Sequence, residues 1–149
     1  MSPVPTPQHQ EVVHHLTTVL DGPADAAGLD VHHVVNVRLG PARIVIPDLV
    51  IARPVDPHGR VVDASAVVLV AEVVSAHSAV LDRVLKMHLY AEAGIAWYLV
   101  VEPDGDAVSL RLFGLDDGNY GLRATAAPGD PLTLVEPVTV TVESRVLAP

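Results

Sequence analysis

The chain has 149 residues, enough to bury a substantial core, and we expect a single domain over residues 1–149. Half of the residues are hydrophobic and only 3% are aromatic, which excludes a disordered chain and predicts a core of Val, Leu, Ala and Ile. The net charge of -9 argues against a broad basic surface for nucleic-acid phosphates. Cysteine is absent, which excludes disulfides and thiolate metal sites.

The hydrophobic segments are too short for a membrane protein. No apolar run approaches the roughly 20 residues that a membrane-spanning helix needs. The first ten residues, MSPVPTPQHQ, have neither the basic start nor the apolar core of a signal peptide. We therefore expect a cytoplasmic protein with no membrane segment.

The first forty residues predict a helix followed by a strand. Apolar side chains over residues 8–20 have the spacing of one buried helical stripe, and Asp21-Gly22-Pro23 predicts the end of that helix. Residues 22–30 are expected to form a loop or a frayed continuation of it. Residues 32–39 form an alternating pattern that predicts a strand. Gly40-Pro41 then predicts a turn.

Two apolar strands follow, and each contains one carboxylate. Residues 43–53 predict a strand with Pro47 in its middle, and proline cannot donate a hydrogen bond to a sheet. We therefore expect an edge, a bulge or a bend there, which would orient the next side chain, Asp48. Residues 66–74 are continuously apolar except for Glu72, which predicts a strand buried on both faces.

The second half of the chain predicts one helix and a series of strands. Ser75 or Ser78 is expected to cap the helix, which ends at Gly94. Its buried side is expected to carry Val80, Val84, Met87 or His88, and Ala91. The strands that we expect after it cover residues 96–102, 108–113 and 120–124, with a last hairpin or edge ribbon at 131–135 and 138–142. This order predicts a mixed α/β (α+β) domain with one central mixed sheet flanked by helices.

Asp48, Glu72 and Lys86 form the best functional candidate. Carboxylates are costly to place in apolar strands, and Lys86 is the only lysine in the chain. Mg²⁺ and Mn²⁺ bind hard oxygen ligands, so two carboxylates on neighbouring strands predict a metal site. A nearby ammonium would stabilise charge on a phosphate. Asp82 and Tyr90 lie one helical turn on either side of Lys86, where they would support it.

Structural interpretations of these residues stay open at this level. Asp48 follows a proline and is compatible with a turn residue bonded to backbone. Glu72 is compatible with a strand-end carboxylate that reaches solvent, and Lys86 with an ordinary solvated lysine. The eight histidines show no spacing typical of a zinc site, although His9 and His88 are candidates for secondary positions near the cleft. Trp97-Tyr98 is expected to pack the helix against the sheet.

The segments PDLV, AEVVS and DRVLKMHLYAEAGIAWYLVV, in this order, resemble the Uma-two family of restriction endonuclease-like proteins, in the PD-(D/E)XK nuclease superfamily. MSPVPTPQHQEVVHHL resembles the opening helix of that family, and VSLRLFGLDDGNY its closing hairpin. The resemblance implies a restriction endonuclease-like core with Asp48 and Glu72 as metal ligands. Val74 occupies the usual position of the lysine, which points to Lys86 as its replacement. A preceding ELIDGE-like segment of the family is expected to be missing.

We therefore expect a metal-dependent endonuclease that hydrolyses DNA phosphodiester bonds with Mg²⁺ or Mn²⁺. Its partner would be DNA, and a homodimer is the arrangement expected of a nuclease that cuts both strands. The alternative is a catalytically degenerate family member that acts as a binding or interaction module. The acidic charge, the missing segment and Val74 favour that alternative.

Overall fold

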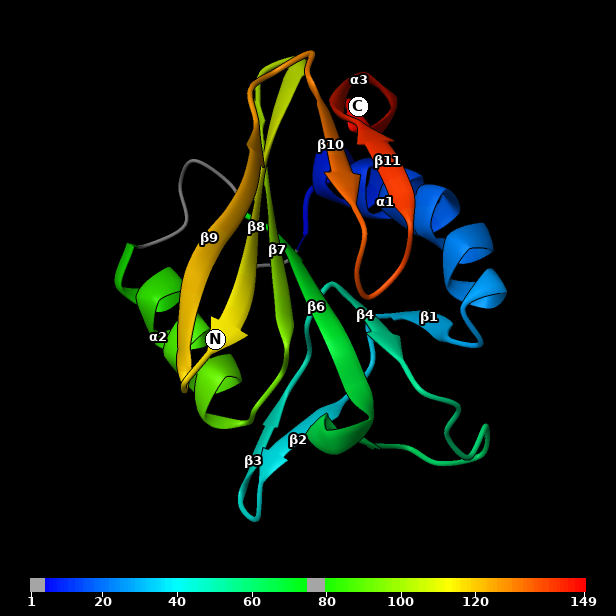
Figure 1. Cartoon of the computed structure of the whole chain (residues 1–149), viewed down its shortest axis with the longest axis vertical. Helices are drawn as coiled ribbons and strands as arrows, with labels where there is room; N and C mark the ends of the chain where they lie inside the picture. Colours follow the sequence, from blue (N-terminus) through cyan, green and yellow to red (C-terminus); the bar gives the residue numbers. More distant parts are fainter. Residues whose placement is uncertain (1–4, 75–79) are drawn as a thin grey trace.

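The fold is built from one central sheet with helices on both faces (Figure 1). A computed structural model describes residues 5–74 and 80–149. Its elements are α1 (Pro7–Ala26), β1 (Asp30–His33), β2 (Val37–Gly40), β3 (Arg43–Val45), β4 (Leu49–Ala52), β5 (Val62–Asp63), the 3₁₀ turn η1 (Ala64–Ala66), β6 (Val67–Val73), α2 (Val80–Glu92), β7 (Trp97–Asp104), β8 (Ala107–Asp116), β9 (Asn119–Ala126), β10 (Pro131–Leu134), β11 (Val140–Glu143) and α3 (Ser144–Leu147).

The central sheet has six strands in the order β1-β4-β6-β7-β8-β9. Strands β6 and β7 are parallel, because the connection between them contains α2, and the other pairs are antiparallel. A smaller sheet, β3-β2-β5, lies beside it, and β10 and β11 form a two-stranded ribbon. The mixed central sheet and flanking helices confirm the predicted fold class.

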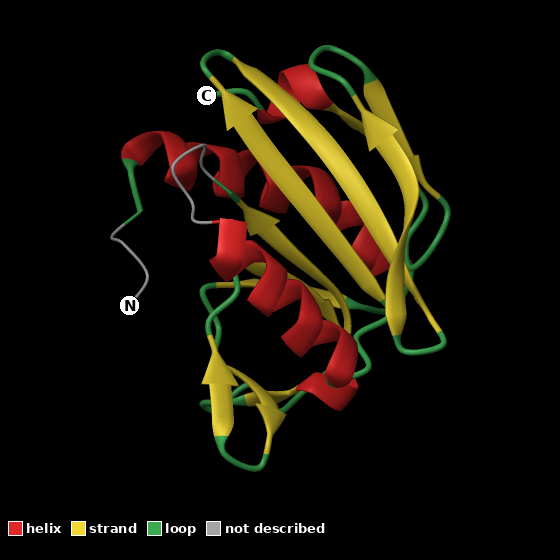
Figure 2. Ribbon diagram, turned by 90° about the vertical axis from the view of Figure 1, so that its left-hand side faces the viewer, coloured by secondary structure: helices red, strands yellow, loops and turns green. Residues whose placement is uncertain are grey.

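The two faces of the sheet carry two separate apolar cores. Helix α1 packs Leu16 and Leu20 against one face, where Leu69 and Ala71 of β6 point. Helix α2 covers the opposite face, and its Tyr90 packs with Val70 of β6. Figure 2 shows α2 in front of the sheet and α1 behind it. Because side chains alternate along a strand, Glu72 points to the α2 face together with Val70.

Helix α1 is longer than the sequence pattern predicts. The predicted end at Asp21-Gly22-Pro23 is wrong, since the helix continues through Pro23 to Ala26. Pro23 removes one helical hydrogen bond, but Leu20 and Ala24 on either side are fully buried, and their burial offsets this cost. The helix ends before Gly28, which adopts the left-handed conformation (φ 73°).

Both strands predicted before residue 54 are interrupted. Val34 has a positive φ of 53° and separates β1 from β2, so residues 32–39 do not form one strand. Residues 46–48 separate β3 from β4, which places a bend at Pro47 as predicted. The interruption lets β3 pair with β2 while β4 enters the central sheet.

Helix α2 shows a different face to the sheet than its apolar pattern predicts. Val80 and Val84 are exposed (66% and 59%), so their predicted burial is wrong, whereas Met87 packs partly buried against the core. The side facing the sheet instead carries Lys86 and Tyr90, which contact Glu72. The predicted caps at 75 and 78 lie outside the described residues. None of the helices within the described ranges is long and apolar enough to span a membrane.

Candidate active site

Two neighbouring strands bring Asp48 and Glu72 together. Strands β4 and β6 pair with Leu49 opposite Ala71, so Asp48 and Glu72 occupy the next opposed positions of the two strands. Asp48 directly follows the bend at Pro47, where the chain turns from β3 into β4. The predicted effect of the proline, a bend that sets the direction of Asp48, agrees with this geometry.

Asp48 is held by two donors from distant parts of the chain. The backbone N–H of Val73 donates a hydrogen bond to its Oδ2 at 2.8 Å. Nε2 of His9, on α1, lies 3.2 Å from the same oxygen. Both contacts use the same oxygen, Oδ2.

Glu72 is a buried carboxylate that contacts two side chains of α2. Only 4% of the residue is exposed, which overturns the interpretation of a strand-end group that reaches solvent. The Tyr90 hydroxyl donates a hydrogen bond to its Oε1 at 2.5 Å, and Lys86 Nζ lies 3.9 Å from the same atom. Lys86 Nζ is also 3.9 Å from Asp82 Oδ2. The structure thus places all five predicted site residues in one contiguous group.

The two carboxyl groups have opposite pKa shifts. Burial, and then the negative charge of Asp48, raise the pKa of Glu72 to about 7. Burial alone would raise the pKa of Asp48 too, but the hydrogen bonds from His9 and Val73 outweigh it and lower that pKa. The same pairing with Asp48 raises the pKa of His9. The pair therefore favours a charged Asp48 next to a Glu72 that titrates near neutral pH.

A cluster of aromatic rings fixes the position of α2 over the site. The rings of Tyr90 and Tyr98 meet edge to face with centroids 5.4 Å apart, and Phe113 and Tyr120 extend the cluster from Tyr98. Burial and the charge of Glu72 raise the pKa of Tyr90, so its hydroxyl stays protonated and remains a donor. Tyr98 packs the helix against the sheet as predicted, whereas Trp97 packs on the α1 face.

The two histidines proposed for secondary positions differ in outcome. His9 joins the site through Asp48, and its Nδ1 is buried with no hydrogen-bond partner in the described chain. His88 lies on the exposed side of α2, where its Nε2 is 3.4 Å from Glu92. The backbone donor at Val73 has no signal in the sequence, because every residue except proline carries an N–H group.

A divalent cation fits the donors of this site. Asp48 and Glu72 are hard oxygen ligands, and a cation would offset the negative charge of Asp48 that, after burial, raises the pKa of Glu72. Within the described ranges no three His, Asp or Glu side chains converge on one point. Mg²⁺ sites commonly use one or two carboxylates and complete their coordination with water and substrate phosphate. Asp48 and Glu72 would therefore hold the ion.

The comparison with protein families decides the relationship of this chain. The model of the Uma2 family, described as "Putative restriction endonuclease", matches residues 1–146. The chain belongs to the Uma2 family. This membership confirms the relationship expected from the PDLV, AEVVS and DRVLKMHLYAEAG segments.

A solved structure supports the fold of this Uma2 protein. The crystal structure of a putative nuclease belonging to DUF820 from Anabaena variabilis superposes with a TM-score of 0.71 at 12% sequence identity. The alignment covers 99% of the present chain and 83% of the other one. The likeness confirms the restriction endonuclease-like fold expected from the sequence. A search of curated proteins returned no match.

Proposed function

We propose that this Uma2 protein is a metal-dependent endonuclease that hydrolyses DNA phosphodiester bonds. The observation that carries the proposal is the convergence of Asp48, just before β4, with Glu72 of β6 and Lys86 of α2. Family membership supports a nuclease function in general. The metal, Mg²⁺ or Mn²⁺, and DNA as the substrate are inferred from the chemistry of the site.

The side chains of the site would have three roles in hydrolysis: metal binding, stabilisation of negative charge, and positioning. A bound divalent cation polarises the phosphoryl group and lowers the pKa of water. Asp48 and Glu72 would hold it through their carboxylate oxygens. The Lys86 ammonium, 3.9 Å from Glu72, adds positive charge where the phosphate accumulates negative charge. Asp82 and Tyr90 are positioning residues, because they contact Lys86 and Glu72 respectively.

The absence of lysine at position 74 is compatible with this chemistry. Val74 is buried with 8% exposure, and it packs in the apolar core on the α2 face. The ammonium comes instead from Lys86, whose contact with Glu72 crosses from the helix to the strand. We infer that Lys86 replaces the lysine that the superfamily usually carries two residues after the glutamate.

Plasmid cleavage tests the proposal directly. Supercoiled plasmid incubated with the protein and Mn²⁺ or Mg²⁺ should be nicked or linearised, and EDTA should stop the reaction. Glu72→Gln and Lys86→Ala should each abolish cleavage. Glu11→Gln, at an exposed position of α1, is the matched control and should cleave like the wild type. Undiminished cleavage by Glu72→Gln would refute the assignment of the site.

The alternative function, a binding module without catalysis, draws on one observation, the net charge of -9. Calorimetric titration with Mn²⁺ and Mg²⁺ separates the two functions. Binding that is lost in Glu72→Gln supports the endonuclease, whereas no binding at millimolar concentrations supports the module. A homodimer stays a prediction, and light scattering on the purified protein measures it.

A further inference from the structure

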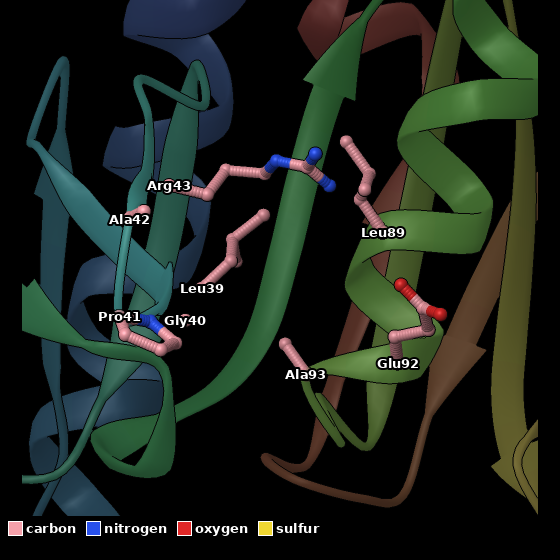
Figure 3. A pocket seen from close by; sticks show the side chains of 8 residues that line it. All are labelled: Leu39, Gly40, Pro41, Ala42, Arg43, Leu89, Glu92 and Ala93. Atoms are coloured by element: carbon pink, nitrogen blue, oxygen red, sulfur yellow. The ribbon is translucent and has the colours of Figure 1, made fainter.

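A cleft opens between the β2–β3 turn and helix α2, the helix that also carries Lys86 (Figure 3). Its volume is about 290 Å³. The side chains that matter for its chemistry are Leu39, Pro41, Arg43, Leu89, Glu92 and Ala93. Apolar groups therefore contribute to both walls, and each wall carries one charge.

The walls of the cleft belong to the elements that build the site. Leu89 follows Lys86 by three residues, which places it on the same side of α2, and Ala93 directly follows the last residue of that helix. Arg43 begins β3, and the chain reaches Asp48 five residues later. A polynucleotide with its scissile phosphate at Asp48 and Glu72 would therefore enter the cleft with the neighbouring nucleotide.

Arg43 supplies the positive charge of the cleft. Its side chain extends from the β2–β3 turn across the cleft toward Leu89 (Figure 3). Salt bridges in the described chain occupy Arg38, Arg83 and Arg111. No described carboxylate lies within 4.0 Å of Arg43, so its planar guanidinium is available to a phosphate.

Charge and size together select the occupant. Glu92 on the α2 wall repels a phosphate, which therefore lies on the Arg43 side, with the sugar and base against Leu39 and Leu89. A volume of about 290 Å³ is at the lower limit of small-ligand pockets and does not admit a double helix. Duplex binding also relies on many phosphate contacts, and this chain has nine basic residues against 18 acidic ones.

We propose that the cleft binds one unpaired nucleotide next to the scissile phosphate, with Arg43 on its phosphate. The substrate class is accordingly single-stranded DNA, or the unpaired strand of a flap or loop, in preference to an intact duplex. This inference rests on the proposed nuclease function for the position of the scissile phosphate. It also accounts for an acidic protein that acts on DNA, since few phosphates need to be neutralised.

Fluorescence anisotropy in EDTA tests the proposal without cleavage. The probes are a fluorescein-labelled 12-nucleotide single strand and the blunt 12-base-pair duplex formed by that strand and its unlabelled complement. The wild type should bind the single strand about tenfold more tightly than the duplex. Arg43→Ala should weaken single-strand binding about five- to tenfold and reduce the slope of log K against log salt by about 0.7, the value of one phosphate contact on a single strand. Arg43→Lys should retain part of the affinity.

Matched variants distinguish single-strand binding in the cleft from a general effect of positive charge. Arg60→Ala removes another exposed arginine, outside the cleft, and should leave single-strand binding unchanged. Ala93→Trp fills the cleft and should abolish the preference for the single strand, with circular dichroism confirming the fold. Equal or tighter binding of the duplex by the wild type, or wild-type affinity in Arg43→Ala, would overturn the proposal.

Binding and cleavage data together distinguish a failure of the cleft proposal from a failure of the proposed endonuclease function. Single-strand binding that depends on Arg43, in a protein that never cleaves, would support the cleft and refute the endonuclease. Cleavage that depends on Glu72, with Arg43→Ala fully active and duplex preferred, would support the endonuclease and refute the cleft.

Discussion

Replacing Glu72 with glutamine should stabilise the protein at alkaline pH. The carboxyl group is 4% exposed, and burial next to the charge of Asp48 raises its pKa from 4.5 to about 7. Glutamine has the same shape and keeps an oxygen that accepts the Tyr90 hydrogen bond, but it carries no charge to bury. The substitution therefore removes an electrostatic penalty with little change in packing.

The pH dependence of this effect follows from the direction of the shift. Below pH 4.5 the group is protonated in both the folded and the unfolded chain, so it adds no pH-dependent term. As pH rises to about 7 the unfolded chain releases its proton first, so the folded state loses stability. A shift from 4.5 to about 7 corresponds to about 3 kcal/mol of lost stability above pH 7.

Urea unfolding followed by circular dichroism at pH 4.5 and pH 8, in EDTA, measures the effect. Glu72→Gln and the wild type should have similar free energies of unfolding at pH 4.5. At pH 8 the variant should be more stable by up to about 3 kcal/mol. Added Mn²⁺ should stabilise the wild type at pH 8 and leave the variant unchanged, because only the native carboxylate pair binds the ion.

A pH-independent difference between the two proteins would refute this reasoning. It would mean that Glu72 ionises in the folded protein as readily as in the unfolded chain. Glu11→Gln, on the exposed side of α1, controls for the loss of one negative charge. That control should show no gain in stability at pH 8.

Two further predictions concern helix α1. His9→Ala should destabilise the protein by about 1 kcal/mol between pH 4 and 6.5 and by less at pH 8. The reason is that the lowered pKa of Asp48 and the raised pKa of His9 confine the charged pair to that window. Urea unfolding at several pH values measures the effect, and a pH-independent loss of stability would contradict it. Leu16→Ala should lower the free energy of unfolding by about 2–5 kcal/mol because the side chain is fully buried. The control Leu81→Ala, at a 79% exposed position of α2, should change it by less than about 0.5 kcal/mol. Equal losses of stability in thermal unfolding would contradict the described core.

The sequence alone predicts the fold class and groups the candidate site residues. Strand β6 is a run of apolar residues with one carboxylate, and such a run predicts a buried strand whose charged member has a special role. The spacing of Asp82, Lys86 and Tyr90 places them on one side of a helix, whichever way that helix is turned relative to the sheet. These are local regularities, so no knowledge of the packing is required to see them.

Local patterns failed where packing overrides them. Helix α1 passes the stop signal at Pro23 because the residues on either side are buried by the sheet. Helix α2 turns a mixed side with Lys86 and Tyr90 toward the sheet and leaves Val80 and Val84 exposed. The buried carboxylate of Glu72 attracts those polar groups, and that attraction is invisible in the hydrophobic pattern of the helix.

The chemistry of the trio was decided by tertiary structure. Asp48 meets His9, 39 residues earlier, and the N–H of Val73, 25 residues later. Those contacts lower the pKa of Asp48, while burial beside it raises that of Glu72. The sequence alone nominates the residues of the candidate site, because residue type and local spacing can be seen in it directly. Only the fold determined their charge states and the adjacent cleft, because both depend on which distant segments the sheet register brings into contact.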